Sequence, residues 1–293
     1  MNSKIVNLIK KYLPRSSYLR ARKLGTQILQ KFHPRLSEEE IRGILINKLG
    51  INKGSVVFIH SSVDKLFLNF PYYELLPILR DIVGPDGTLL FSCSHIIIRA
   101  EDYLSRPDAV FDVKRSVTVR GILPEMARME TDAYRSLHPT NSVVAIGRLA
   151  KELTMYHQDT IFPCGEKSPF FEITKHMGVI IGLGVGVDRL SFVHCVEDVM
   201  KDRFPIQTRL DKIFDCKVID YDRKIRYIKT LVAKNIKYRN VEKYMRKYVS
   251  KDICHSFSYK RISFFRANAR LLFEKMEELA KEGKTIYFQE NEN

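Results

Sequence analysis

The sequence lacks any apolar stretch long enough to cross a bilayer. A membrane-spanning helix needs about 20 consecutive apolar residues, and the apolar run from Val179 to Val187 is short and broken by three glycines. Near the N-terminus, Lys10 and Lys11 interrupt the chain before the apolar core of a secretory signal can form. We therefore expect no transmembrane helix, no secretory signal and a cytoplasmic protein.

Cysteine is also scarce: there are five, and no two of them form a Cys-x-x-Cys pair. Such pairs frame zinc sites and redox dithiols, so we expect reduced thiols and no bound metal. Cys195 follows His194 directly. Neighbours in a helix point about 100° apart, so these two side chains cannot work together as nucleophile and base.

Motifs for nucleic acids and nucleotides are missing as well. The sequence has no zinc finger, no aromatic signature of an RNA-recognition domain, no GxxG loop of the KH type and no phosphate-binding GxxxxGK[ST] loop. The segment Gly182-Leu-Gly184-Val-Gly186 follows a buried strand, but its spacing differs from the GxGxxG of dinucleotide-binding proteins. We interpret it as a turn in which glycine permits close backbone approach, and we expect no nucleic-acid partner.

What the sequence does have is basic charge, 49 Lys and Arg against 34 Asp and Glu, concentrated toward its ends. The balance is +6 over residues 1–40 (9 basic, 3 acidic), −1 over 41–200 (17 and 18) and +13 over 201–273 (20 and 7). Such an excess suits an anionic lipid surface, an acidic carrier protein or a phosphorylated substrate. The simplest alternative is a solvated surface that aids solubility.

Strand patterns alternate with helix patterns through the middle of the chain. Apolar runs bounded by turn residues predict strands over 55–60, 88–91, 143–146 and 179–183. Helical periodicity predicts helices over 38–49, 72–83 and 148–156, and another from about 189. This alternation indicates an α/β protein with three α/β/α layers around a parallel or mixed sheet.

The two ends read differently. Apolar residues over 5–13 recur at helical spacing among lysines, which predicts a short basic amphipathic helix that packs on its own domain or lies on a membrane. Beyond residue 203 we expect short strands over 206–210 and 217–221, a helix over 263–281 and an edge strand over 285–288. We divide the chain into an N-terminal extension (1–36), an α/β core (37–203) and a basic C-terminal part that completes the fold and the acceptor site (204–293).

His194 and Glu197 form the main candidate for catalysis. They are three residues apart, so they share one face of the helix expected after the glycine turn. A histidine oriented by a carboxylate can remove a proton from an amine near neutral pH. The pair also follows a strand end, where open α/β sheets bind ligands. An ordinary surface contact is the alternative interpretation.

Two polar segments are further candidates. The first strand ends in His60-Ser61-Ser62, which offers small donors and backbone N–H groups. The loop before the strand at 143–146 contains a guanidinium, an imidazole and hydroxyls suited to a phosphate or an amide-rich cofactor. A purely structural loop is equally consistent with these residue types.

Seven short motifs occur in one order along residues 40–200. They are Val57-Phe-Ile-His60-Ser61-Ser62, Gly84-Pro-Asp-Gly-Thr88, Phe111-Asp112, Gly121 with Glu125 and Arg128, Arg135-Ser136-x-His138-Pro139-x-x-Ser142, Gly165-x-x-Ser168-Pro169 and His194-x-x-Glu197. With these motifs the chain resembles the aminoglycoside 3-N-acetyltransferase family of antibiotic N-acetyltransferases.

The resemblance implies a three-layer fold with a mixed sheet, unlike that of the GNAT acetyltransferases. It also implies transfer of an acyl group from acetyl-CoA, or another acyl-CoA, to a primary amine of a sugar, without a metal. His194 would be the catalytic base and Glu197 its partner. Carried over in the same way, the cofactor residues are His60, Ser61, Ser62, Arg135, Ser136, His138, Ser142 and Ser168, and the acceptor residues are Asp112 and Glu125. Groups near Ser61 and Ser62 would hold the oxyanion.

Two departures from the family pattern bear on the substrates. Arg120 stands where the family has methionine. This change makes a longer acyl group, or an acyl carrier protein as donor, an alternative to acetyl-CoA. The charge of +13 after residue 200 does not suit polycationic aminoglycosides. We therefore expect an anionic acceptor, such as a nucleotide-linked amino sugar of polysaccharide synthesis. The alternatives are an aminoglycoside-resistance enzyme and a non-catalytic relative that binds polyanions.

Overall fold

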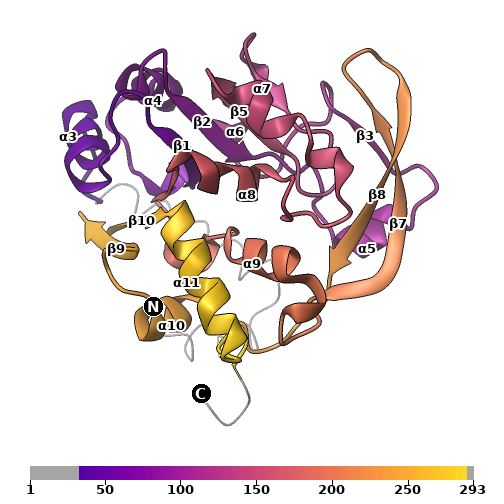
Figure 1. Cartoon of the computed structure of the whole chain (residues 1–293). Coiled ribbons are helices and arrows are strands. Elements are labelled where there is room, and N and C mark those ends of the chain that lie inside the picture. The colour runs from indigo at the N-terminus through magenta and orange to yellow at the C-terminus, as the bar shows by residue number, and fades with distance from the viewer. Residues whose placement is uncertain (1–32, 289–293) are drawn as a thin grey trace, which may run out of the picture.

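A seven-stranded mixed sheet forms the centre of the protein (Figure 1), for which a computed structural model describes residues 33–288. The strand order is β4-β5-β2-β1-β6-β10-β9, with β1 parallel to β2 and β6 and all other neighbours antiparallel. The bounds are β1 (Val56–Ser61), β2 (Thr88–Ser92), β4 (Tyr134–Arg135), β5 (Val143–Gly147), β6 (Val179–Leu183), β9 (Cys254–Tyr259) and β10 (Ile262–Asn268). The carboxyl ends of β1, β2 and β6 thus lie at one edge.

Helices cover both faces of this sheet, and each face has its own buried core. Successive side chains of a strand point to opposite faces, so Val57 and Ile59 pack in one core while Val56 and Phe58 pack in the other. The first core contains residues of α3 (Glu38–Gly43), α4 (Leu75–Val83) and α6 (Ile122–Met129). The second contains residues of α7 (Ala150–Thr154), α8 (Pro169–Glu172), α9 (Val193–Met200), α10 (Val241–Tyr248) and α11 (Ala269–Lys281). The predicted three-layer α/β/α fold is confirmed.

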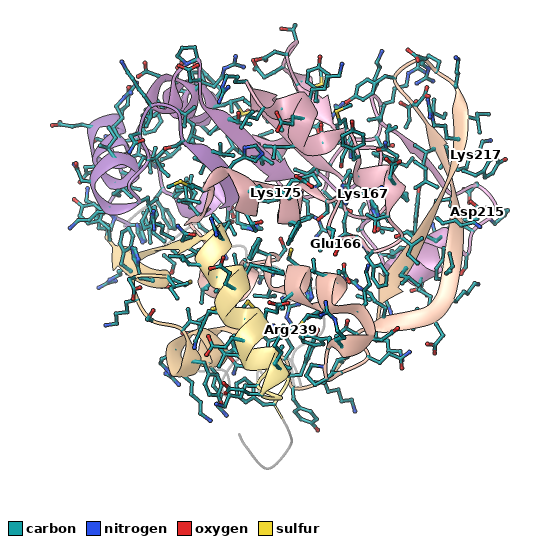
Figure 2. All side chains as sticks on the ribbon, in the orientation of Figure 1. Glu166, Lys167, Lys175, Asp215, Lys217 and Arg239 are labelled. Atoms are coloured by element: carbon teal, nitrogen blue, oxygen red, sulfur yellow. The ribbon has the colours of Figure 1, made fainter. Side chains whose placement is uncertain are left out.

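A second, smaller sheet stands beside the first at the right of Figure 1. It joins β3 (Val110–Asp112) to the long hairpin of β7 (Arg209–Ile219) and β8 (Ile225–Ala233), next to α5 (Ala100–Leu104). Asp215 and Lys217 project from β7 in Figure 2. The two short strands expected over 206–210 and 217–221 are therefore wrong: one continuous strand occupies most of that stretch.

The C-terminal part also differs from the expectation. Residues 263–268 belong to β10, so the predicted helix begins only at Ala269. The turn between β9 and β10 consists of Lys260 and Arg261, both with positive φ (47° and 61°). Two-residue hairpin turns of this kind usually contain Asn-Gly or Asp-Gly, so these two basic side chains gave no turn signal. The edge strand expected over 285–288 is reduced to one bridge between Tyr287 and Arg239.

Smaller differences concern element boundaries. The helix expected over 38–49 is α3 followed by a π-helical turn, Ile44–Lys48, and the helix expected from about 189 begins at Val193. Within residues 33–288 no helix combines the length and apolar character that crossing a bilayer requires. The amphipathic helix expected over 5–13 lies outside the described residues. The division of the chain at residues 36 and 203 stays a prediction.

Candidate active site

His194 and Glu197 lie on α9 and contact each other through their side chains. The Nδ1 atom of His194 is 2.9 Å from Oε2 of Glu197, and the hydroxyl of Tyr287 donates a 3.0 Å hydrogen bond to Oε1 of the same carboxylate. The Glu197 side chain is only 2% exposed, whereas that of His194 is 20% exposed. The buried carboxylate thus fixes one ring nitrogen while the imidazole stays accessible.

The surroundings keep Glu197 ionised despite its burial. Burial alone would raise the pKa of Glu197, but the pKa is lowered by the charge and hydrogen bond of His194. The Arg209 guanidinium and the Tyr287 hydroxyl lower the pKa of Glu197 further. An ionised, immobile carboxylate favours the Nδ1–H tautomer of the imidazole and leaves Nε2 as a proton acceptor.

His194 lines two cavities at once. The strand-end cavity, about 640 Å³, is lined by Ile59, His60, Ser61, Ser62, Lys65, Ser92, Ser94, Val119, Arg120, Pro124, Asn141, Ser142, Phe170, Val185, Arg189, Ser191, His194 and Arg239. The hairpin cavity, about 430 Å³, is lined by Arg99, Ala100, Glu101, Thr140, Asn141, Pro163, His194, Arg209, Leu231, Val232, Ala233, Lys234 and Asn235. His194 and Asn141 line both cavities, so the imidazole of His194 lies where two ligands can meet.

The strand-end cavity is strongly cationic. It is lined by Lys65, Arg120, Arg189 and Arg239, and no carboxylate is among its lining residues. Arg189 pairs with Asp188 at 3.1 Å, while the other three make no ion pair within the part of the chain that the structure describes. Guanidinium and ammonium groups left without carboxylates suit the phosphates of a ligand such as a nucleotide-containing cofactor.

Two buried polar atoms on the wall of this cavity have no partner. They are Nε2 of His60 and Oγ of Ser191, and neither makes a hydrogen bond within residues 33–288. Burial lowers the pKa of His60 to about 4, so its ring is neutral near pH 7. Buried polar groups without partners are costly, which makes both atoms available to a bound ligand.

Four of the residues expected to contact the cofactor line the strand-end cavity: His60, Ser61, Ser62 and Ser142. The backbone N–H of Ser62 is not available to a ligand, because it donates a hydrogen bond to the carbonyl of Leu183 at 2.9 Å. Gly184 permits this close approach, since a Cβ there would lie 2.6 Å from the carbonyl oxygen of Ser62. The turn interpretation of this glycine is confirmed, and the Ser62 N–H is no oxyanion donor.

The other cofactor candidates are not among the residues that line the strand-end cavity. The buried Arg135 donates hydrogen bonds to the backbone carbonyls of Cys93 and Ser116. Its guanidinium thus connects the two loops that contain these residues. Ser136 contacts His157 at 2.8 Å, and Nδ1 of His138 accepts from the backbone of its own turn. Ser168 caps α8 by accepting from the Phe171 N–H. None of these four residues lines either cavity, and their expected contact with the cofactor stays a prediction.

The two acceptor candidates are likewise outside both cavities. Asp112 pairs with Arg223 at 2.5 Å, and Glu125 pairs with Arg128 at 2.6 Å. The pKa of each carboxyl is lowered by its arginine partner, although burial opposes the shift. Both charges are therefore compensated by a partner within the protein. The expected role of Asp112 and Glu125 in binding the acceptor stays a prediction.

Sequence reasoning missed Tyr287 and Arg209. Tyr287 reaches Glu197 from a segment 90 residues later in the chain, and no spacing pattern marks it. Arg209 lines the hairpin cavity and binds Asp198 with two hydrogen bonds, of 2.6 Å and 2.5 Å. Asp198 directly follows Glu197, so an acidic pair on the helix was the one available signal.

The cysteine side chains are poorly placed to act as nucleophiles. All five cysteines are free and buried, and burial raises the pKa of Cys195 well above its ordinary value. A thiol that stays protonated is a poor nucleophile. Within residues 33–288 no three histidine, cysteine or carboxylate side chains gather as metal ligands.

The three-layer fold thus places the imidazole of His194, paired with a buried carboxylate, between two cavities. The sequence profile of the family described as aminoglycoside 3-N-acetyltransferase matches residues 58–281. Aminoglycoside N(3)-acetyltransferase III of Pseudomonas aeruginosa is 29% identical over 192 residues, which cover 60% of this chain and 68% of the relative. Aminoglycoside N(3)-acetyltransferase IX of Micromonospora chalcea is 29% identical over 172 residues, which cover 53% and 61%. The crystal structure of aminoglycoside acetyltransferase AAC(3)-Xa has a TM-score of 0.73 at 19% identity and covers 91% of this chain and 99% of its own.

The chain therefore belongs to the aminoglycoside 3-N-acetyltransferase family. Membership confirms three expectations from the sequence: the resemblance itself, the enzyme class, which is N-acetyltransferase, and acetyl-CoA as co-substrate. A further solved structure, titled AAC-IIIb binary with CoASH, shares the fold with a TM-score of 0.70 at 19% identity, covering 87% of this chain and all of its own.

Proposed function

We propose that the enzyme transfers the acetyl group of acetyl-CoA to a primary amine of an amino sugar, with His194 as general base. The observation that carries this proposal is the position of His194 on the shared wall of the two cavities. The strand-end cavity, with its unpaired cations and no carboxylate, suits the phosphates of CoA. The hairpin cavity then takes the acceptor. The cytoplasmic location expected from the sequence is part of this proposal.

His194 performs the proton transfers. The amine arrives as an ammonium ion and must lose a proton before its nitrogen can attack the thioester carbonyl, and Nε2 of His194 takes that proton. As the C–N bond forms and the C–S bond breaks, the nitrogen loses a second proton. One of the two protons passes to the thiolate sulfur to give free CoA, and the other is released to solvent. The unpartnered atoms of His60 and Ser191 are the candidates to hold the carbonyl oxygen as it gains charge.

The acceptor has two candidates. The names of the relatives favour an aminoglycoside, acetylated on its 3-amino group. The charge of the hairpin cavity favours an anionic amino sugar, because Arg99 and Lys234 line it and Glu101 is its one carboxylate. Polycations bind best where carboxylates gather. Nothing in the described residues favours an acyl carrier protein as donor or a membrane contact.

An acceptor panel separates the candidates. The purified enzyme is given acetyl-CoA with kanamycin or with UDP- and dTDP-linked amino sugars, and release of the CoA thiol is followed. Turnover of kanamycin alone establishes the aminoglycoside acceptor. Turnover of a nucleotide-linked sugar alone establishes the anionic acceptor. Calorimetry without acceptor tests the donor site, and an enzyme that fails to bind acetyl-CoA contradicts the proposal.

A further inference from the structure

We propose that Tyr287 is a positioning residue for catalysis, which holds Glu197 so that this carboxylate orients His194. The proposal rests on the general-base role given to His194 above. It adds a third member to the His–Glu pair, contributed by the C-terminal segment. Tyr287 lies beyond residue 281, where the match to the family profile ends, so the matched motifs do not include it.

Each oxygen of the Glu197 carboxylate has one partner. His194 contacts Oε2 at 2.9 Å, and the Tyr287 hydroxyl donates to Oε1 at 3.0 Å. With its side chain only 2% exposed, Glu197 has little access to water as a substitute. A buried carboxylate oxygen that loses its donor pays the cost of desolvation. The Tyr287 hydroxyl therefore fixes the rotation of the carboxylate and, through it, the plane of the imidazole.

The local backbone keeps Tyr287 in place. The N–H of Asn240 donates to the carbonyl of Ile286 at 2.9 Å, and the N–H of Phe288 donates to the carbonyl of Tyr238 at 3.2 Å. Ile286 and Phe288, on either side of Tyr287, are buried in the core that also contains α9. The backbone of residues 286–288 thus pairs with the segment just before α10. This pairing keeps the Tyr287 hydroxyl within hydrogen-bond distance of Glu197.

The same segment reaches the strand-end cavity. Arg239, labelled in Figure 2, pairs with Tyr287 through the backbone, and its side chain lines that cavity. The paired residues thus have two roles: Arg239 contributes a cation to the proposed donor site, and Tyr287 donates a hydrogen bond to the Glu197 carboxylate. Such continuity is what a segment that positions catalytic groups requires.

The surroundings of Tyr287 favour the protonated hydroxyl, which is the form that donates a hydrogen bond. Burial raises the pKa of Tyr287, and the negative charge of Glu197 raises it further. Four other groups interact electrostatically with Glu197. His194 and Arg209 favour its ionised form, and its charge acts in turn on Asp198 and Cys164. Among these four groups and Tyr287, only Tyr287 and His194 form hydrogen bonds with the carboxylate.

The test compares Tyr287→Phe with Tyr248→Phe. Both tyrosines are half-buried against the same core, and each substitution removes only a hydroxyl, but only Tyr287 bonds to Glu197. We expect Tyr287→Phe to lower kcat about tenfold, equivalent to about 1.4 kcal/mol, with KM for acetyl-CoA changed less than twofold. Tyr248→Phe should match the parent enzyme. A wild-type kcat in Tyr287→Phe would overturn the proposal.

A double-mutant cycle with Glu197→Gln tests whether Tyr287 acts through that carboxylate. In the Glu197→Gln background we expect Tyr287→Phe to change kcat less than twofold. The same tenfold loss in both backgrounds would show a general structural role and refute the proposal.

NMR of the His194 ring nitrogens gives a readout that needs no activity. Without the tyrosine hydroxyl the Glu197 carboxylate is free to rotate, so in Tyr287→Phe the nitrogen chemical shifts of the His194 ring should move toward those of a mixture of the two neutral tautomers. Unchanged ring shifts would contradict the inference even if no acceptor were ever found. Changed ring shifts in an enzyme that acetylates nothing would retain it and reject the proposed function instead.

Discussion

The ion pair between Asp198 and Arg209 should be among the most stabilising polar contacts near the site. Arg209, at the start of β7, binds both carboxylate oxygens of Asp198 on α9, at 2.6 Å and 2.5 Å, and the two side chains are 11% and 0% exposed. Burial alone would lower the pKa of Arg209, but the Asp198 carboxylate outweighs it and raises that pKa. Asp198 also accepts from the Cys164 N–H at 2.7 Å. The pair thus joins the hairpin to the helix that carries His194.

Arg209→Met leaves the Asp198 carboxylate buried without its cation. Removing one partner of a buried pair costs about 3–5 kcal/mol, which corresponds to a fall in Tm of about 10 °C for a chain of this size. The double variant Asp198→Asn with Arg209→Met buries no charge and should recover more than half of that loss. Urea and thermal unfolding measure both variants.

A surface pair provides the control. Arg270 and Glu274 form an ion pair at 2.9 Å, but their side chains are 65% and 53% exposed. Arg270→Met should therefore change the free energy of unfolding by less than about 0.5 kcal/mol. If Arg209→Met destabilised the protein no more than Arg270→Met, the argument from burial and bidentate geometry would be refuted.

Three further predictions follow from single positions. Gly182→Ala should cost about 1–3 kcal/mol in urea unfolding, because a Cβ there overlaps the ring of Phe265. The Glu40 pKa is lowered to about 2, chiefly by its hydrogen bond from Lys260. Glu40→Gln should therefore be less stable than the parent protein above about pH 4.5. This difference in the free energy of unfolding should shrink as the pH falls and be gone near pH 2. Arg120→Met should raise KM for acetyl-CoA about fivefold with little change in kcat, and an unchanged KM would place the phosphates elsewhere.

The central pair of the site could be predicted from the sequence because its geometry is local. Residues three apart in a helix share a face, so the spacing of His194 and Glu197 alone placed them together. The strand before α9 indicated the edge of the sheet at which ligands bind. His60, Ser61 and Ser62 were predictable for the same reason, since they end a neighbouring parallel strand.

Residue type alone could not separate ligand contacts from structural contacts. Arg135 and His138 have the chemistry of phosphate-binding residues, yet both are buried and bonded to protein groups. Whether a polar side chain faces a cavity or a neighbouring loop depends on tertiary packing. Asp112 and Glu125 show the same dependence on packing, because their arginine partners come from another part of the fold and from the next helical turn.

Long-range partners gave no signal in the sequence. Tyr287 meets Glu197 only because β10 and α11 bring the C-terminal segment back beside α9. The hairpin that lines the second cavity was also missed in part, since β8 lies in a stretch where basic residues obscure the alternation of apolar and polar side chains. Predicting either would require the strand pairing first.

The most direct test of the account is His194→Ala, assayed with acetyl-CoA and whichever amine the parent enzyme accepts. Calorimetric binding of acetyl-CoA should change less than twofold, because the cations of the strand-end cavity remain. If His194 is the general base, kcat should fall about 10²–10⁴-fold. Turnover within tenfold of the parent enzyme, with an unchanged pH profile, would contradict the assignment of His194 as the general base.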